Sequence, residues 1–403
     1  MRRLQDLAAN KAIRIAVLCV LALMAAVSVY AGIKNALEYS QDFQWDAAKA
    51  LSMRLDPYEL SKSPESARQY PELDAFYRMF TDRGLKQKME ANQFPSLLML
   101  LAPMTVFAPQ TAKVVWCVLN LLFTAGIIFL LRKTFFAKTD AFDYCAAVLL
   151  MIAGTPFRNQ LGVGQHTLFA FFFFMLAVYL DVSQPDCLPP GRSIAVSLCL
   201  FVSYFKYTLT APLALYFLYR KRYKEIALSV LGHVILTEIA AIRLGKSFIY
   251  MIKAPLGVAS ALAAEGGIDL GVLFGGTASY VVAFVIAVIL TLVAVRLHAG
   301  QEKLLFAVLI LWSLILTYHR TYDFFVLSAV ATVFGGTLAE SYGEKVKNAL
   351  LCWYVILLVA VYFGLRLFNE NTASKIAVGL IYYAFTVAMT VLAVKLTRKK
   401  DNG

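Results

Sequence analysis

Apolar runs alternate with short charged clusters along nearly the whole chain. The first run extends from Ile13 to about Tyr30, beside a basic N-terminal stretch. Later runs, mostly of the roughly 15 to 20 residues that a membrane span needs, lie near residues 113–131, 144–157, 161–180, 193–205, 208–219, 226–245, 278–297, 303–317, 323–338, 347–366 and 375–395. The pattern predicts an all-α polytopic membrane protein with about twelve transmembrane helices, in a single integral membrane domain over residues 1–403.

Two long segments separate predicted spans, at residues 33–112 and 246–277. The first carries charged and aromatic residues at helical spacing, as in "YPELDAFYRMFTDRGLKQKMEANQF", which predicts short amphipathic helices along the membrane surface. Within it, we interpret the apolar run 94–109 as a re-entrant or interfacial helix. A full span there would separate Arg132 and Lys133 from the side that the other basic clusters share.

Basic clusters follow alternate predicted spans and indicate the orientation of the chain. They are Arg132/Lys133/Lys138, Arg220/Lys221/Arg222/Lys224, Arg296/Lys303, Lys345/Lys347 and Arg398/Lys399/Lys400. Because Lys and Arg accumulate in cytoplasmic loops, we expect both termini in the cytoplasm. Segments 33–112 and 246–277 are then a first and a second outer loop.

The composition supports a membrane protein and excludes other classes. Hydrophobic residues make up 60% and charged residues 16% of the chain, whereas soluble domains contain roughly 25% charged residues. The formal net charge of +13 is spread over short clusters instead of one stripe, which argues against nucleic-acid binding. The cysteines form no C-x-x-C pair and no Cys/His cluster, so neither a disulfide framework nor a zinc site is indicated.

Polar and ionisable residues gather at the predicted outer ends of the helices. Ionisable side chains at membrane depth are costly and by default indicate a functional site, although a single Lys or Arg can instead snorkel to the interface. Because many such residues converge on one side, we favour a site. The candidates are Asp42, Asp46, Asp56, Asn92, Arg158, Gln165, His166, Lys206, His319, Arg320, Tyr322 and Asp323.

Three of the polar segments suggest particular chemistry. "GTPFRNQLGVGQHTLF", residues 154–169, is either a turn that offers backbone N–H groups and an Arg to an anion or a plain polar loop. Lys206 interrupts an apolar stretch and needs an anion nearby, a bound phosphate or an aspartate. His319 and Asp323 share a face if their segment is helical, as an oriented acid/base pair or as a structural pair.

A carboxylate-led polar pocket on the outer face suits two classes of function. One is transfer of a group from a lipid-linked donor, by a glycosyltransferase or by a polymerase or ligase of surface glycans. The other is transport, by a transporter or flippase whose buried charges form a substrate path. Transporters built from repeats show two similar halves, and no such repeat is visible here. An enzyme is therefore favoured.

The order of several motifs resembles glycosyltransferase family 87, which belongs to the GT-C class and includes polyprenyl-phosphate-mannose-dependent α-mannosyltransferases. The matching stretches are "DFQWDAAKALSMRLDPYEL" after the first span, "NQFPSLLMLLAP", Gly164-Gln165, Phe205-Lys206, and His319 followed by Tyr322-Asp323. Two positions depart from the family pattern. Asp46 stands where relatives carry an aromatic residue, and Arg54 stands where they carry the glycine before Asp-Pro-Tyr.

The resemblance implies a GT-C fold in the bacterial inner membrane, with an outward-facing active site. It implies an inverting transfer of mannose, or of a pentose such as arabinofuranose, from a polyprenyl-phosphate donor to a glycolipid or glycan acceptor, without a metal. Asp42 would be the general base, and Asp46 would assist it if the two share a helix face. The implied donor phosphate ligands are Lys206, Arg158, His319 and Arg320. The implied sugar or acceptor ligands are Gln165, His166, Tyr322, Asp323, Asn92, Asp56 and Tyr58.

Overall fold

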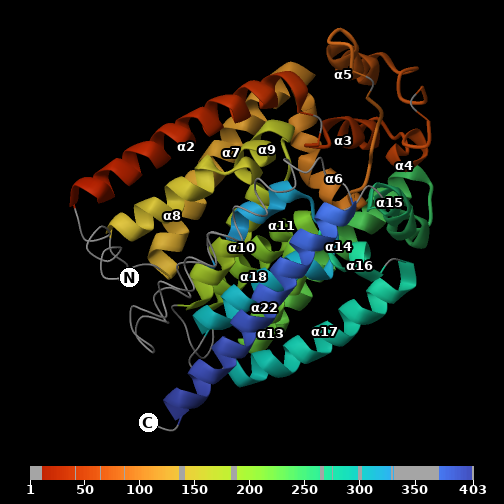
Figure 1. Ribbon diagram of the computed structural model, residues 1–403. Helices are drawn as coiled ribbons and strands as arrows, with labels where there is room; N and C mark the ends of the chain where they lie inside the picture. Colours follow the sequence, from red (N-terminus) through yellow and green to blue (C-terminus); the bar gives the residue numbers. More distant parts are fainter. Residues whose placement is uncertain are drawn as a thin grey trace.

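The computed structural model describes residues 11–40, 42–63, 65–85, 87–135, 141–182, 188–263, 267–274, 276–297, 302–327, 330 and 372–401. Within these residues all regular structure is helical (Figure 1), which confirms the predicted all-α class. The α-helices are α2 (Lys11–Tyr39), α3 (Trp45–Ser52), α4 (Pro57–Leu60), α5 (Pro71–Thr81), α6 (Pro95–Leu101), α7 (Pro109–Thr134), α8 (Ala141–Ala153), α9 (Thr155–Val163), α10 (Thr167–Val182), α11 (Pro190–Ser203), α12 (Tyr207–Leu213), α13 (Leu215–Tyr219), α14 (Tyr223–Leu244), α15 (Phe248–Ala263), α16 (Leu270–Phe274), α17 (Gly276–Leu297), α18 (Glu302–Leu316) and α22 (Thr372–Asp401). The 3₁₀ helices are η1 (Ala102–Val106), η2 (Tyr204–Lys206) and η3 (Thr321–Leu327).

Several helices have the length and apolar character that crossing a membrane requires. The described residues contain 5 such stretches, and 6 if the bent pair α9–α10 is counted as one span. By length and composition alone they are Lys11–Tyr39, Pro109–Thr134, Pro190–Leu213, Tyr223–Leu244 and Thr372–Lys395, although Pro190–Leu213 is interrupted at η2. The protein is therefore a polytopic membrane protein. The predicted total of about twelve stays a prediction, because the expected spans at 323–338 and 347–366, with Lys345 and Lys347, lie largely outside the described residues.

The stretch from α11 to α13 folds back on itself at η2. Ser193, in the first turn of α11, donates a hydrogen bond to Glu225 of α14 at 2.5 Å, so both ends of the stretch lie together. At the other end the Thr210 hydroxyl donates to the Ser203 carbonyl at 2.9 Å, a contact over seven residues, whereas a Thr hydroxyl in a regular helix reaches the carbonyl three or four residues back. The predicted runs 193–205 and 208–219 are thus two limbs of a hairpin, with Lys206 at its apex.

An ion-pair cluster holds the pole of the bundle opposite this apex. Asp181, at the end of α10, accepts from Arg220 Nε at 2.7 Å and from Arg222 Nε at 2.5 Å. Arg220 also lies 3.7 Å from Glu302 at the start of α18. Because Asp181 and Arg222 are buried, each needs the other to offset its desolvation. The cluster therefore joins α10, α13 and α18 at one pole, where α2 begins and α22 ends (Figure 1).

The polar segment 154–169 is mostly helical, not a loop. Its residues Thr155–Val163 form α9, which packs along α2 and makes an angle of 108° with α10. Small residues allow this close packing: a Cβ added at Gly32 would lie 2.9 Å from the Leu161 side chain, and one added at Gly162 would lie 2.9 Å from Asn35. The sequence indicated a turn over the whole segment, because Gly and Pro punctuate it. The structure confines the turn to the residues between α9 and α10.

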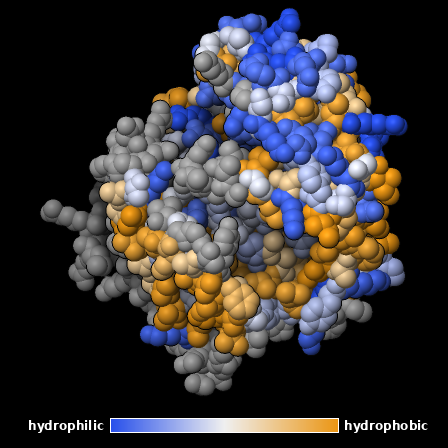
Figure 2. Space-filling model, turned by 90° about the vertical axis from the view of Figure 1, so that its right-hand side faces the viewer, coloured by the Kyte–Doolittle hydropathy of each residue, from blue (hydrophilic) through white to orange (hydrophobic). Residues whose placement is uncertain are grey.

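The first outer segment, residues 33–112, contributes most of a second apolar core above the bundle, which buried residues of α7, η2, α14 and α15 complete. The apolar face of α5 packs against Phe43, Trp45 and the rest of this segment, so it is covered by protein and not by the membrane surface as predicted. The expected amphipathic helix itself is present. Figure 2 shows hydrophilic side chains gathered over this upper part and hydrophobic side chains below it. The apolar run 94–109 gives only α6 and η1, of 7 and 5 residues, too short for a straight span.

The segment 246–277, predicted as a second outer loop, contains α15 and α16 and packs onto the first segment. The Tyr250 hydroxyl of α15 donates to Asp56 at 2.7 Å and to Glu59 at 3.0 Å. Asp56 also caps α4, accepting from the backbone N–H groups of Tyr58 and Glu59, and Pro57 occupies the first turn, where a missing N–H costs nothing. The Asp-Pro-Tyr motif therefore starts α4, and its Asp56 also binds the second outer segment through Tyr250.

The Asp181 cluster provides a test of the fold. Asp181→Ala leaves the guanidinium groups of Arg220 and Arg222 buried without their carboxylate, so we expect a loss of about 3 to 5 kcal/mol of stability. Thermal unfolding of the purified protein in detergent measures it. The control is Asp74→Ala, which removes an i, i+4 pair whose Arg78 side chain is 73% exposed and should cost less than about 1 kcal/mol. Equal effects of the two variants would contradict the interpretation.

Candidate active site

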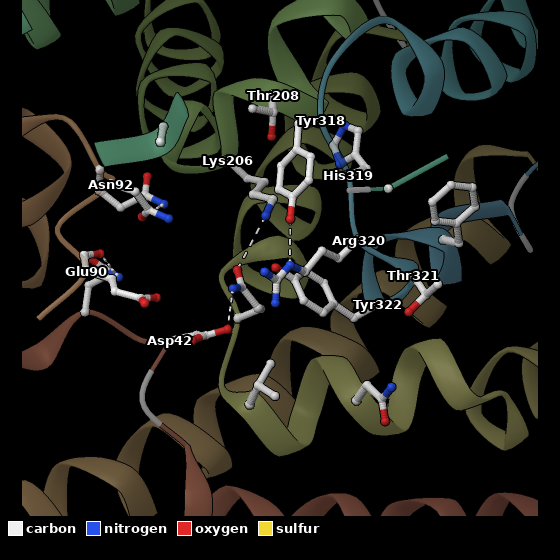
Figure 3. Close-up of a pocket in the computed structure, with 18 of the residues that line it drawn as sticks. Asp42, Glu90, Asn92, Lys206, Thr208, Tyr318, His319, Arg320, Thr321 and Tyr322 are labelled. Carbon is white, nitrogen blue, oxygen red and sulfur yellow. Dashed lines mark hydrogen bonds between the residues drawn. The ribbon is translucent and has the colours of Figure 1, made fainter. Parts of the chain in front are cut away.

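A cavity of about 550 Å³ lies at the pole of the bundle opposite the Asp181 cluster. Its walls come from the end of α2, the first outer segment, the α9–α10 turn, the η2 apex, the loop before η3 and the start of α22. The side chains with functional chemistry that line it are Asp42, Gln44, Glu90, Asn92, Gln93, Asn159, Gln165, Lys206, Tyr207, Thr208, Tyr318, His319, Arg320, Thr321, Tyr322 and Lys375. Figure 3 shows Asp42, Glu90 and Asn92 on one side and Lys206, Arg320 and two tyrosines on the other.

Asp42 lies at the floor of this cavity, in the turn between α2 and α3. Its backbone N–H donates to the Val163 carbonyl at 3.2 Å, and its carboxylate accepts from Gln165 Nε2 at 2.7 Å. Burial raises the pKa of Asp42 above its usual 3.8, although the Gln165 hydrogen bond and the charges of Arg320 and Lys206 lower it. The carboxylate is therefore a stronger base than an exposed aspartate, and Gln165 fixes its orientation.

Gln165 owes its position to the break between α9 and α10. Gly164 ends α9 with φ of 74°, a left-handed conformation that glycine adopts without strain. Its carbonyl accepts from the Trp116 indole at 2.8 Å, and the Gln165 carbonyl accepts from Gln160 Nε2 at 2.6 Å. The amide side chain of Gln165 is thereby held between the Asp42 carboxylate and the Lys206 ammonium, which donates to its oxygen at 3.4 Å.

The buried carboxylate of Asp323 contacts Lys206 and His319 on the cationic side of the cavity. Asp323 Oδ2 lies 3.5 Å from Lys206 Nζ and 2.8 Å from His319 Nδ1, and Thr167 donates to its other oxygen. The predicted His319–Asp323 contact is confirmed, although only Asp323 lies in a helix, η3. Arg320 donates from Nε to the Tyr318 hydroxyl at 2.6 Å. The anion that Lys206 required is thus Asp323, which orients Lys206 toward the cavity.

Asp46 does not share the position of Asp42. It is not among the residues that line the cavity, and it accepts from the Tyr77 hydroxyl at 2.5 Å inside the first outer segment. Gln44, between the two aspartates, has φ of 59°, so Asp42 precedes α3 instead of occupying its first turn. The expectation that Asp42 and Asp46 share a helix face is therefore wrong. Burial raises the pKa of Asp46 to about 6, although the Tyr77 hydrogen bond lowers it.

Four further predicted ligands lie outside the lining of the cavity, as does Asp323. Asp56 caps α4, and Tyr58 is buried and donates to the Gln93 carbonyl at 2.9 Å. Arg158 lies on the face of α9 that packs against α2, and a Cβ added at Gly32 would lie 3.3 Å from the Arg158 carbonyl oxygen. His166 is fully buried between the rings of Trp116, at 5.4 Å, and Phe205, at 4.3 Å. These residues support the walls instead of facing the cavity.

The structure also adds residues that the sequence did not single out. Glu90 lies in "LKQKMEANQF", whose charged residues are typical of a solvated surface. Lys375 lies in the first turn of α22, and Tyr318 adjoins the predicted His319. No local signal distinguishes Glu90 or Lys375, because each reaches the cavity only through the folding of a distant segment. Among the described residues no three His, Cys, Asp or Glu side chains converge in a way that could hold a metal ion.

The fold and the site together define a polytopic membrane protein with a charged cavity at one pole of its helix bundle. The chain belongs to glycosyltransferase family 87, whose family model matches residues 95–318, more than half of its length. No curated protein and no solved structure matches the chain. The family match includes Gln165 and Lys206, whereas Asp42, Glu90, Arg320 and Lys375 lie outside the matched range.

Gly164→Ala tests the role of the α9–α10 turn. The left-handed φ costs a side-chain-bearing residue about 1 to 2 kcal/mol, and the added Cβ would lie 3.2 Å from the Ser40 Cβ. We expect a lower melting temperature and a strong loss of glycosyl transfer, because Gln165 moves with the turn. Gly191→Ala is the control, since no atom lies within 4 Å of its Cβ position. Unchanged activity in Gly164→Ala would refute the importance of this turn.

Proposed function

We propose that this membrane glycosyltransferase moves a sugar, mannose in the first place, from a polyprenyl-phosphate donor to a hydroxyl of a glycolipid or glycan acceptor. The observation that carries the proposal is the bridge through Gln165, which links the Asp42 carboxylate at 2.7 Å and the Lys206 ammonium at 3.4 Å in one cavity. A base and an anion-binding group held at fixed separation are what displacement at a phosphate-activated carbon needs.

In the proposed reaction the acceptor oxygen attacks the anomeric carbon of the donor sugar. The new C–O bond forms as the bond from that carbon to the phosphate oxygen breaks, with inversion. The Asp42 carboxylate takes the proton of the acceptor hydroxyl. Lys206 and Arg320 bind the polyprenyl phosphate that departs, His319 is held beside them by Asp323, and Lys375 also lines the cavity as a further cation. Negative charge moves from the acceptor side of the cavity to the cationic side.

The proposed base is Asp42 and not Asp46. Asp42 lines the cavity, whereas Asp46 lies within the outer segment against Tyr77. A general base must reach the proton that it removes, so geometry decides before pKa. We also propose that no metal is required, because a polyprenyl monophosphate carries its charge on one phosphate and the side-chain cations can neutralise it.

The orientation of the molecule in the membrane supports an outward-facing site. Arg220 and Arg222 lie at the pole opposite the cavity, and the positive-inside rule assigns that pole to the cytoplasm. Both termini then face the cytoplasm and the cavity faces the outer side of a bacterial inner membrane. Such an arrangement suits a lipid-linked donor, which the bilayer delivers to the site laterally.

Asp42→Asn is the direct test of the proposed base. An amide cannot accept the hydroxyl proton, so we expect transfer from polyprenyl-phosphate mannose to fall by about 10² to 10⁴. Asp46→Asn keeps an acceptor for Tyr77 and should retain a rate within about tenfold of the wild type. Purified protein in nanodiscs, assayed for radiolabelled product, gives both rates. Full transfer by Asp42→Asn would rule out the base, and loss only in Asp46→Asn would move the role there.

Reconstituted vesicles separate transfer from transport. A transporter or flippase would move the lipid-linked sugar across the bilayer without forming a new glycosidic bond. The proposed enzyme forms that bond in detergent as well as in vesicles. Movement without bond formation would therefore replace the proposed function.

The pH dependence of transfer follows from the environment of Asp42. The base is active when ionised, and burial raises its pKa, so we expect the acid limb of kcat/KM above the usual aspartate range. The hydrogen bond from Gln165 lowers this pKa. Gln165→Met removes that bond and should move the acid limb to still higher pH, in addition to lowering the rate. An acid limb at the same pH in both proteins would contradict the assignment.

A further inference from the structure

A short segment between α5 and α6, residues Glu90–Gln93, forms the wall of the cavity opposite the cations. Glu90 and Asn92 line the cavity, whereas Ala91 between them is fully buried. In Figure 3 their side chains lie across the cavity from Lys206 and Arg320, with Asp42 below. The segment therefore presents a carboxylate and an amide toward the base and the donor phosphate ligands.

Backbone contacts from three neighbouring side chains hold this wall in place. Gln44 Nε2 donates to the Glu90 carbonyl at 3.0 Å, and Ser61 accepts from the Ala91 N–H at 3.0 Å. The buried Tyr58 donates to the Gln93 carbonyl at 2.9 Å. All three bonds go to backbone atoms of the segment, so the surrounding chain sets the positions of Glu90 and Asn92 at the cavity.

We propose that Glu90, with Asn92, binds the acceptor sugar and selects an uncharged acceptor over an anionic one. This assignment rests on the proposed function, in which the opposite side of the cavity holds the donor phosphate. A carboxylate accepts hydrogen bonds from sugar hydroxyls, and an amide both donates and accepts them. The carboxylates of Glu90 and of the base Asp42 both face the space that the acceptor would occupy. Like charges in a desolvated site strongly disfavour an anionic partner.

The charge distribution assigns the two substrates to different sides. Lys206 and Arg320 line one side (Figure 3) and suit the phosphate. Glu90, Asn92 and Asp42 line the other and suit hydroxyl donors. An acceptor oxygen bound by Glu90 and Asn92 lies beside Asp42, which then takes its proton. Glu90 is thus a specificity-determining residue, and Asp42 remains the base.

The test compares two acceptors that differ in one group, octyl α-mannoside and the corresponding octyl mannuronide, whose C6 is a carboxylate. Purified full-length protein in nanodiscs transfers radiolabelled mannose from polyprenyl-phosphate mannose to each. We expect the wild type to prefer the mannoside by at least about tenfold in kcat/KM. Glu90→Gln should raise KM for the mannoside roughly tenfold, keep kcat within about twofold, and reduce the discrimination against the mannuronide.

Glu72→Gln makes the same change on the exposed face of α5 and is the matched control. Circular dichroism and melting temperature verify that both variants fold. Equal use of the two acceptors by the wild type, or unchanged KM and discrimination in Glu90→Gln, would overturn the acceptor assignment while leaving the proposed function intact. Absence of transfer to either acceptor by the wild type would instead contradict the proposed function, and this assignment with it.

Discussion

The amide of Gln165 is the contact on which the arrangement of the site depends. It donates to the Asp42 carboxylate and accepts from the Lys206 ammonium, so one planar group fixes the acidic and the cationic halves relative to each other. An amide can do this because it offers a donor and an acceptor on opposite sides without carrying charge. A carboxylate in its place would repel Asp42, and an ammonium would repel Lys206.

Breaks in the helices of the bundle position the residues that make this contact. The α9–α10 bend supplies Gln165, the hairpin apex at η2 supplies Lys206, the turn before η3 supplies His319, and η3 itself supplies Asp323. Non-helical backbone within a membrane protein is tolerated where it is buried or lines a cavity. At the other pole the Asp181 cluster joins α10, α13 and α18, and the Ser193–Glu225 hydrogen bond holds the ends of the hairpin together.

Four predicted site residues that line the cavity share one property. Asp42, Gln165, Lys206 and His319 are polar residues in or beside apolar runs, where an unneeded polar group would be costly. Asp56 and Tyr58 fit the same pattern, yet the structure uses them to start α4 and to hold the Glu90–Gln93 wall. Arg54 stands where the family pattern has glycine, and its φ of 60° is a left-handed conformation. Glycine adopts that conformation without strain, which explains the pattern at this position.

By itself the sequence determined the class of protein, the apolar helices and several of the polar residues that line the cavity, because the cost of burying charge in a membrane acts on each segment separately. Only the tertiary structure decided that Asp42 faces the cavity while Asp46 faces Tyr77, and that Glu90 and Lys375 belong to the site. Those outcomes depend on one left-handed residue, Gln44, and on contacts between segments far apart in the chain. The spacing of residues along the sequence does not predict contacts between such distant segments.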